Sequence, residues 1–423
     1  MRPVLIVMAA LVLGASAHAQ DREGAPGSRV AVKPAPDRPD KGAEPQKEEA
    51  AKPAQPMVFF TATGDPDACG AGCSAWIAAE GRIDDSTPGR LRALLAHLGK
   101  RKLPIYFYSP GGSVNAALAM GRMLRARDMT AGVARTIPQG CDPAQAHEPS
   151  CDTLKRSGRA LPAELRTMGA ACNSACVYAL LGATLREVSV DASLGVHSIS
   201  ILRTMTRRNG DGRIVATSST RVTGDTPSIR TAHGRVARYA AEMGISRALV
   251  DAAAAVPTET VRFITREEIV RFGIDKREFI ETRWTADAGT TGSFTKFVME
   301  VRPGEPKRYG VMMMRLGCSR RMIDMRLSRR ATVLDKAPLI VAKAGDREVS
   351  FGTVKAWSDP KGEETDTRTA RVPIYFLERT VAHDTVELIE ATSYATVNTP
   401  LHRATLSTAG FAPLLSALLQ KCQ

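Results

Sequence analysis

Apolar and polar residues along the middle of the chain repeat with two periods, which predicts strands that alternate with helices. Residues 113–127 carry apolar side chains at helical spacing, at Val114, Ala117, Leu118, Gly121 and Leu124. Residues 175–181 are apolar on every side, which predicts a buried helix. Other helices are expected over residues 92–98, 227–243 and 246–254, and strands over 103–108 and 187–190. Residues 58–60 and 76–83 give the first signal of folded structure. Such alternation predicts an α/β fold in which βαβ units build a mainly parallel sheet.

The last part of the chain has a different pattern. From about residue 291, short apolar runs are separated by turn residues, which predicts an additional mostly-β domain over residues 291–423. Its strands are expected over residues 310–316, 322–327, 339–342, 349–353, 372–377 and 386–389, and a terminal helix over 412–419.

The N-terminus predicts export. Arg2 precedes an apolar run over residues 4–13, and Ala17-His18-Ala19 then offers a small-x-small cleavage site. We expect residues 1–19 to be a signal peptide cut after Ala19, and the mature protein to be periplasmic or secreted. The apolar run is shorter than the ~20 residues that span a bilayer, so no transmembrane span is expected after cleavage. The alternative is an uncleaved signal that acts as a weak anchor.

A linker follows the signal peptide. Residues 20–56 are rich in Pro, Lys, Glu, Asp and Ala and contain no aromatic residue. Such a segment cannot bury a core, which predicts a disordered linker.

Charge changes the expected partners only slightly. Lys and Arg number 58 against 44 Asp and Glu, a formal net charge of +14. This favours an anionic envelope surface as a partner, and the alternative is a basic surface with no specific partner. Because no RNA- or DNA-binding signature accompanies the charge, no nucleic-acid partner is expected.

The eight cysteines predict disulfides, because their number is even and the protein is expected to be exported. Cys318 and Cys422 are the only two in the last third of the chain and are expected to pair. Cys141 and Cys151 share a polar excursion over residues 137–168 and could pair locally. No metal site is expected, because no Cys-x-x-Cys pair or nearby histidine pair completes a zinc site.

Two segments carry candidate chemistry. The first is Tyr108-Ser109-Pro110-Gly111-Gly112-Ser113, which lies between an expected strand and an expected helix. Its glycines permit a sharp turn with unobstructed N–H groups, which suits a phosphate or an oxyanion and equally suits an ordinary turn. The segment lacks the Lys-Ser/Thr ending of a P-loop and the third glycine of a dinucleotide-binding fingerprint.

The second segment runs from Gly169 through Ser174 to Cys176 and leads into the apolar helix. A small-residue turn before a buried helix exposes one side chain, here Ser174, and His197 follows the next strand as the candidate base. The structural alternatives are that Ser174 caps the helix and that His197 has no chemical role. Cys172 and Cys176 flank the serine as disulfide partners, buried thiols or rival nucleophiles.

Pro110-Gly111-Gly112, a serine that opens an apolar helix, and a histidine 23 residues later resemble the ClpP/crotonase superfamily. The match is closest to predicted periplasmic ClpP-like proteins of proteobacteria. The later segment from Arg262-Phe263-Ile264-Thr265 to Gly273-Ile274 resembles the closing motif of that family. The resemblance covers about residues 57–280, and implies a ClpP-like spiral of βαβ units over residues 57–283.

By position, the resemblance implies Ser174 as nucleophile, His197 as base, and the N–H groups of Gly112 and Ala175 as the oxyanion hole. It also implies a peptide or protein substrate and no cofactor, and it leaves open whether the protein forms an oligomer. The family has an aspartate where this chain has Val261, so Thr260, Glu259 or a backbone carbonyl would have to orient the histidine. The resemblance and the predicted signal peptide together predict an exported ClpP-like serine hydrolase that acts as an endopeptidase. The alternative is an inactive peptide-binding or envelope-associated protein of the same fold.

Overall fold

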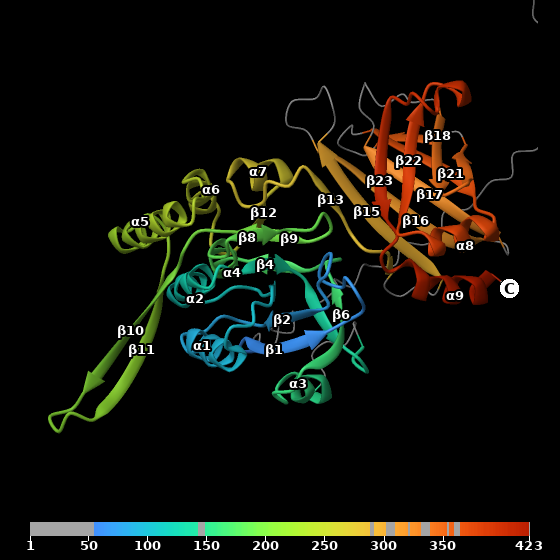
Figure 1. The fold of residues 1–423 in the computed structure, drawn as a ribbon. Coiled ribbons are helices and arrows are strands. Elements are labelled where there is room, and N and C mark those ends of the chain that lie inside the picture. Colours follow the sequence, from blue (N-terminus) through green and yellow to red (C-terminus); the bar gives the residue numbers. More distant parts are fainter. Residues whose placement is uncertain are drawn as a thin grey trace, which may run out of the picture. The chain divides into compact units, whose positions relative to one another are not determined.

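The structure is a computed structural model that describes residues 55–142, 149–287, 292–301, 309–319, 322–330, 339–352, 355–358 and 364–422 (Figure 1). The predicted signal peptide and residues 20–54 of the predicted linker lie outside these residues. Helices and strands both contribute, so the expected α/β class is confirmed. The spiral arrangement and the domain boundary between residues 283 and 291 stay predictions.

A seven-stranded sheet occupies the first part of the described chain, in the order β5-β6-β1-β2-β3-β4-β8. Strands β2, β3, β4 and β8 run parallel to one another, whereas β1 is antiparallel to β2. The strand bounds are β1 Val58–Thr63, β2 Ala75–Glu80, β3 Ile105–Tyr108, β4 Thr130–Val133, β5 Arg135–Pro138, β6 Leu161–Arg166 and β8 Leu185–Glu187.

A smaller sheet, in the order β12-β9-β7, carries the segments with candidate chemistry. It consists of β7 Ala171–Asn173, β9 Ser193–Val196 and β12 Arg262–Phe263, with β7 parallel to β9 and β12 antiparallel to it. The isolated bridge between Ser109 and Cys172 links the end of β3 to β7 and so joins this sheet to the larger one.

The helices of this part bury the faces that the sequence pattern predicts. In α2 (Val114–Ala126), the Ser113 hydroxyl accepts from the Ala116 amide, and Ala117, Leu118 and Leu124 are buried. Helix α4 (Ala175–Leu181) is buried at every position. The remaining helices are α1 Thr87–Leu98, α3 Pro149–Lys155, α5 Pro227–Glu242, α6 Ala248–Ala254 and α7 Arg266–Arg271.

The polar excursion expected over residues 137–168 contains strands and a helix that the sequence did not predict. Strand β5 and helix α3 lie there, and β6 pairs in parallel with β1 and extends the large sheet. Buried Lys155 on α3 lies 2.7 Å from buried Glu80, so this segment is packed into the fold. Burial alternates along Leu161–Leu165, as expected for a strand. The polar residues around this short run hide that alternation in the sequence.

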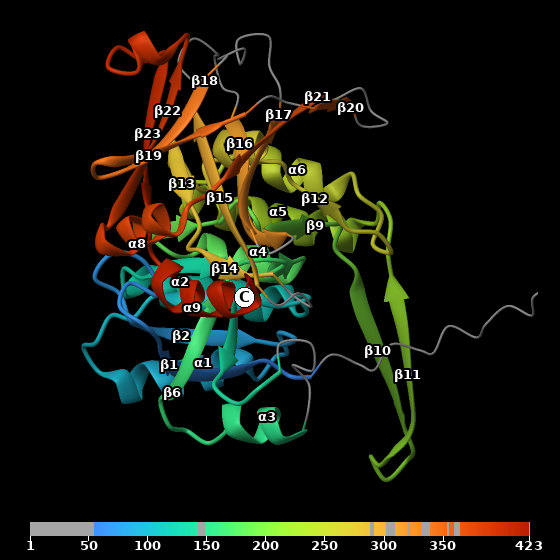
Figure 2. The same ribbon diagram turned by 90° about the vertical axis from the view of Figure 1, so that its right-hand side faces the viewer.

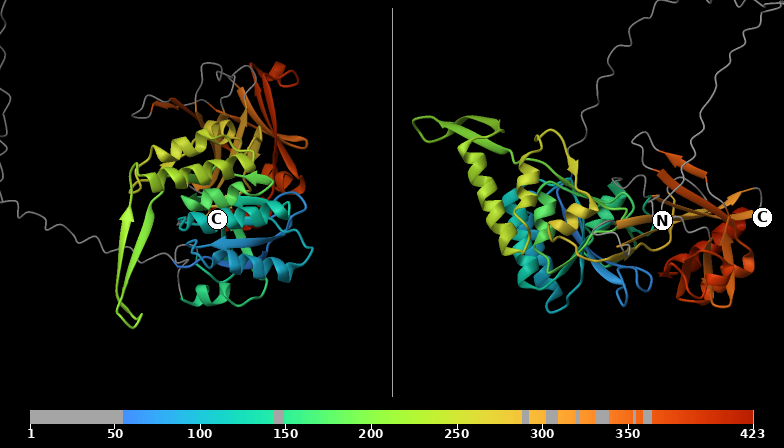
Figure 3. Two further views of the ribbon diagram at one scale, coloured as in Figure 1. Left: turned by 90° about the vertical axis from the view of Figure 1, so that its left-hand side faces the viewer. Right: turned by 90° about the horizontal axis from the view of Figure 1, so that it is seen from above.

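A hairpin of β10 (Ile201–Arg208) and β11 (Ile214–Val222) follows His197, where no element is predicted. It extends away from the neighbouring elements in all views (Figures 1, 2 and 3). Every residue from 202 to 221 is exposed. Since neither face is buried, the residues show no period-2 alternation by which the sequence could have predicted the strands.

The last part of the chain is rich in antiparallel strands (Figure 3). One sheet has the order β13-β15-β16-β17-β21-β20, with β14 paired to β15, and another has the order β19-β18-β22-β23. The bounds are β13 Phe279–Glu281, β14 Thr285–Ala286, β15 Ser293–Val301, β16 Tyr309–Ser319, β17 Met322–Arg330, β18 Leu339–Ala344, β19 Arg347–Phe351, β20 Lys355–Ser358, β21 Glu364–Arg371, β22 Thr385–Ala391, β23 His402–Ser407, α8 Ile374–Ala382 and α9 Phe411–Cys422.

The strand expected over residues 372–377 is wrong, because α8 begins there. Phe376, Leu377 and Thr380 are buried at helical spacing, and Pro373 stands at the N-cap. A short apolar run is compatible with a strand or with a helix, so its pattern alone does not decide between the two. Here the burial of Thr380, one turn further on, identifies the helix.

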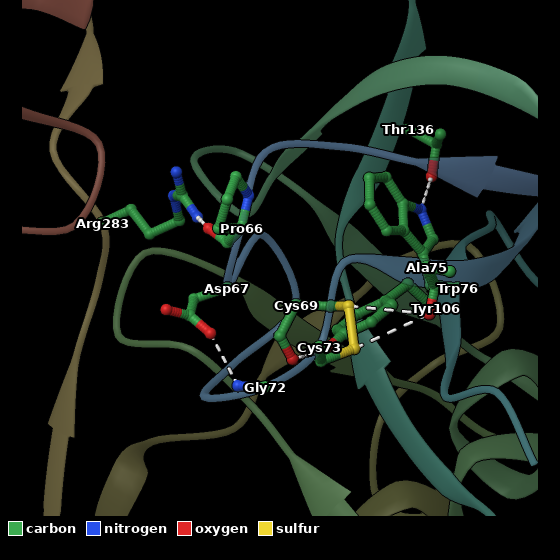
Figure 4. Close-up of a disulfide and its surroundings, with 10 residues drawn as sticks. All are labelled: Pro66, Asp67, Cys69, Gly72, Cys73, Ala75, Trp76, Tyr106, Thr136 and Arg283. Carbon is green, nitrogen blue, oxygen red and sulfur yellow. Dashed lines mark hydrogen bonds between the residues drawn. A yellow bond between two sulfur atoms is a disulfide. The ribbon is translucent and has the colours of Figure 1, made fainter. Parts of the chain in front are cut away.

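All eight cysteines are paired. The expected pair Cys318–Cys422 is confirmed. Of the possibilities left open by the sequence, Cys141 pairs with Cys151 and Cys172 with Cys176, and the pair Cys69–Cys73 was not foreseen. Figure 4 shows Cys69–Cys73 in its loop, where the Asp67 carboxylate accepts from the Gly72 amide and Tyr106 donates its hydroxyl to the Cys69 carbonyl.

The buried carboxylate of Asp275 holds the end of α7 against the loop after β8. It accepts from the Val188 amide at 2.9 Å, from Arg266 at 3.1 Å and from Arg277 at 2.8 Å. Burial alone would raise the pKa of Asp275, but the hydrogen bonds and charges of Arg277 and Arg266 outweigh it and lower the pKa to about 2. Because this is below the ordinary value of ~3.9, the ionised carboxylate stabilises the fold above about pH 4, and that contribution is lost as the pH falls towards 2.

We expect Asp275→Asn to lower the free energy of unfolding at pH 7 by ~3 kcal/mol, because it leaves two arginines facing a neutral amide. Urea denaturation between pH 7 and pH 2 would also show a shallower loss of stability in the variant than in the wild type. Asp211→Asn, in the exposed hairpin turn, is the control and should change neither quantity. Equal stability of Asp275→Asn and wild type at pH 7 would contradict the expectation.

Candidate active site

Ser174 occupies a sharp turn between β7 and α4. Its φ is +55° and its ψ is −124°, and only Asp67 and Asp128 share a positive φ among the described non-glycine residues. A side chain in this region costs of order 1–3 kcal/mol unless the surroundings hold it. The Ser174 amide donates to the Gly195 carbonyl at 2.7 Å, and the neighbouring Asn173 amide donates to the Ser109 carbonyl at 2.9 Å.

The Ser174 hydroxyl does not cap α4. No capping hydrogen bond is present, and among the described residues the hydroxyl has no hydrogen-bond partner. The structural alternative of an N-cap is therefore wrong, and the half-buried hydroxyl stays available for other chemistry.

His197 follows the end of β9, beside the end of β7 that carries Ser174. Strands β7 and β9 are parallel, with Asn173 opposite Gly195, so Ser174 and His197 both leave the carboxyl edge of this sheet. No hydrogen bond joins the Ser174 hydroxyl to the imidazole. The two side chains therefore share an edge without direct contact of that kind.

A backbone carbonyl orients the imidazole. His197 Nδ1 lies 2.7 Å from the Ser198 carbonyl oxygen. A carbonyl can only accept, so Nδ1 carries the proton and Nε2 keeps its lone pair. This is the tautomer that a general base requires.

The side chains considered as orienting groups do not make that contact. Strand β12 pairs Arg262 with Val196, which puts Val261 beside His197, and Val261 is 43% exposed. Thr260 donates to the Pro257 carbonyl instead. The hydrogen bond from Thr258 lowers the pKa of Glu259, and the charge of a protonated His197 adds to that effect, so Glu259 acts on His197 only through space.

The glycine turn packs directly against the serine. A Cβ on Gly111, whose φ is +98°, would lie 2.6 Å from the Asn173 carbonyl oxygen, 2.7 Å from Ser174 Cβ and 3.0 Å from the Ala175 nitrogen. Only glycine fits such a position. Gly111 thus contributes to the site through its lack of a side chain, which the sequence analysis did not single out.

The two amides assigned to the oxyanion hole are unused. Neither Gly112 N–H nor Ala175 N–H donates to a protein acceptor among the described residues. The Gly112 turn is held on both sides, because Ile83 donates to the Gly111 carbonyl and Ser113 donates to the Ile83 carbonyl, each at 2.8 Å. Available N–H donors on a turn held by hydrogen bonds are what oxyanion stabilisation needs.

The small sheet has one further unusual feature. Asn173 Oδ1 is buried without a hydrogen-bond partner, and it would lie 2.4 Å from a Cβ on Gly195. Val261 Cγ1 lies equally close to that position, at 2.5 Å. Gly195 therefore lets an amide and an apolar side chain approach the same point beside Ser174.

Cys172 and Cys176 bracket Ser174 and are joined by a disulfide. Both are fully buried. A sulfur in a disulfide is not a nucleophile, so these cysteines do not compete with the serine in the oxidised protein. Among the described residues no cluster of histidine, cysteine or carboxylate side chains is placed to hold a metal ion.

No family model and no curated protein matches the sequence. Solved structures with partial likeness include a serine-to-alanine mutant of the 1510-N membrane-bound stomatin-specific protease, at 15% identity over 47% of this chain and 75% of that one, with a TM-score of 0.30. A second mutant of that protease, in complex with a substrate peptide, has 15% identity, covers 47% and 71%, and has a TM-score of 0.29. ClpP1 from Listeria monocytogenes has 14% identity, covers 46% and 85%, and has a TM-score of 0.27.

We expect Gly111→Ala to lower the free energy of unfolding by ~2–4 kcal/mol, because its Cβ would overlap the backbone at the serine. Gly89→Ala in α1 is the matched control, since a Cβ there meets nothing within 4 Å. That variant should keep or gain stability in chemical denaturation. A Gly111→Ala protein as stable as the wild type would contradict the close packing of turn and serine.

Proposed function

We propose that this chain is an exported serine hydrolase of ClpP-like fold that cleaves peptides, with Ser174 as nucleophile and His197 as general base. One observation carries the proposal: the uncapped Ser174 stands at a positive-φ turn packed against Gly111, and the neighbouring Gly112 and Ala175 amides are unused. The tautomer of His197 supports it, because Nε2 is left free.

The chemistry would follow the order of acyl transfer. Ser174 Oγ attacks the scissile carbonyl carbon while its proton moves to His197 Nε2. The carbonyl oxygen becomes an oxyanion that accepts from the Gly112 and Ala175 amides, and collapse then expels the amine, which takes the proton from Nε2. Water repeats these steps on the ester. Substrate binding has to bring Oγ within ~2.6–3.2 Å of Nε2, because no hydrogen bond joins them in this structure.

Export is part of the same proposal. Four disulfides in one chain are typical of an oxidising compartment, and the predicted signal peptide would deliver the protein there. No helix among the described residues is long and apolar enough to cross a bilayer. The spiral fold over residues 57–283 and a separate mostly-β domain over residues 291–423 belong to the proposal too, as does assembly into an oligomer.

We expect the mature protein, with Gln20 as its first residue by intact mass, to react covalently with a fluorophosphonate probe. Ser174→Ala should abolish labelling, and His197→Ala should slow it by about a thousandfold or more, because the hydroxyl loses its base. Ser218→Ala, on the exposed hairpin, is the control and should label at the wild-type rate. Folded wild type that never labels, or labelling that survives Ser174→Ala, would favour the inactive peptide-binding alternative.

A second candidate function, envelope association, is favoured by the hairpin of β10 and β11. Its exposed residues 202–221 include five arginines and one acidic residue, Asp211. Four large apolar side chains are at least half exposed on the same hairpin: Leu202, Met205, Ile214 and Val215. Basic and apolar side chains together on a projecting ribbon suit an anionic lipid surface, at ~1 kcal/mol for each arginine near the surface.

We expect the mature protein to sediment with phosphatidylglycerol-containing vesicles at low salt and not with pure phosphatidylcholine vesicles. Replacing Arg203, Arg207 and Arg213 by Gln should weaken binding by about tenfold or more. Replacing the exposed Arg92, Arg101 and Arg235 by Gln removes the same charge elsewhere and should have a smaller effect. Equal loss in both triple variants would show that net charge, rather than the hairpin, determines binding.

A further inference from the structure

The Cys172–Cys176 disulfide closes a short covalent ring around Ser174. Cys172 is the middle residue of β7, and Cys176 is the second residue of α4. Their Cα atoms lie 5.3 Å apart, and both side chains are fully buried. The ring contains only Asn173, Ser174 and Ala175 between its ends, so it constrains the nucleophile, its φ and the Ala175 amide together.

Ser174 needs such a constraint. A positive φ at a residue with a Cβ persists only where the surroundings over-determine it. The Ser174 amide makes one hydrogen bond, to Gly195, and the contact with Gly111 limits movement on the other side. The disulfide adds the only covalent restraint, and it ties the strand that precedes the turn to the helix that follows it.

The Cys69–Cys73 disulfide offers a comparison within the same chain. Its two cysteines have the same sequence separation, 4, and their Cα atoms lie 5.0 Å apart. Its ring encloses Gly70 and Gly72, which are exposed and where a Cβ would meet nothing within 4 Å. The same covalent ring thus occurs once around a tightly packed serine and once around a surface turn.

We infer that the Cys172–Cys176 disulfide is a positioning element of the hydrolase site, an inference that rests on the proposed function. It holds Ser174 in the conformation that presents Oγ and the Ala175 N–H to one substrate carbonyl. Formation of the bond removes two electrons and two protons from the thiols, by exchange with an exogenous disulfide that is reduced to a dithiol. The hydrolase therefore acquires its full activity only after export to a compartment that supplies such a disulfide.

The test compares Cys172→Ala/Cys176→Ala with the matched control Cys69→Ala/Cys73→Ala in the mature full-length protein. The rate of fluorophosphonate labelling is measured against probe concentration. We expect the maximal rate of the first variant to fall about tenfold or more, because a small misplacement of a nucleophile is costly. The probe concentration at half-maximal rate should stay within about threefold, and the control should match the wild type in both quantities. Equal maximal rates in the two variants would overturn the inference.

A second readout does not depend on activity. Hydrogen–deuterium exchange of residues 170–182 should become faster in Cys172→Ala/Cys176→Ala and stay unchanged in the control. Unchanged exchange would overturn the positioning role, whereas faster exchange with no labelling of wild type would overturn the proposed function alone. Cys172→Val/Cys176→Ala keeps more of the buried volume. If neither Cys172→Ala/Cys176→Ala nor Cys172→Val/Cys176→Ala unfolds cooperatively, the disulfide is a requirement of the fold and the positioning inference is wrong.

Discussion

Three backbone hydrogen bonds at the junction of the two sheets hold the candidate site together. The Ser109 amide donates to Ala171 and the Asn173 amide to Ser109, which ties the end of β3 to β7. The Ser174 amide then donates to Gly195, which ties the turn to β9. Each bond contributes only ~1 kcal/mol net, yet together they bring residues 109, 174 and 195 to one point. The positive φ of Ser174, the contact with Gly111 and the edge shared with His197 all depend on this junction.

The residue that precedes β12, beside His197, is Val261, so this neighbour brings no charge to the imidazole. The Ser198 carbonyl fixes the tautomer of His197, a task that an aspartate performs in a full triad. A carbonyl is a dipole, so it stabilises an imidazolium less than a carboxylate would. Glu259 is close enough to contribute some charge but is exposed, so water screens it. Under the proposed function, Ser174 and His197 would act as a dyad, in which the protonated base is stabilised less than it is in a full triad.

The strand-rich last part of the chain carries constraints of its own. The Cys318–Cys422 disulfide joins β16 to α9 across 104 residues, which in the chain-entropy model is the kind of loop that gains most from closure. Buried Arg329 on β17 lies 2.7 Å from Glu390 on β22 and 3.3 Å from Asp366 on β21. Buried charges of this kind persist only when paired, so they link strands of two sheets whose apolar residues share one core.

The sequence by itself determined the elements whose signal is local. The apolar run of α4, the helical face of α2, the glycine turn and three of the four disulfides could be predicted, because each depends on neighbouring residues, composition or cysteine count. The exposed hairpin after His197, the strand β6 and the helix α8 could not, since their burial or lack of it depends on distant partners. Only the tertiary structure decided that Gly111 packs on Ser174, that the hydroxyl leaves the helix uncapped, and that a carbonyl rather than Thr260 or Glu259 orients His197. Gly111 and Ser174 lie 63 residues apart (174 − 111), and periodicity along a chain carries no information about which backbone atoms meet across it. Ser198 is adjacent to His197, but its carbonyl meets the imidazole only because of the backbone conformation that follows β9.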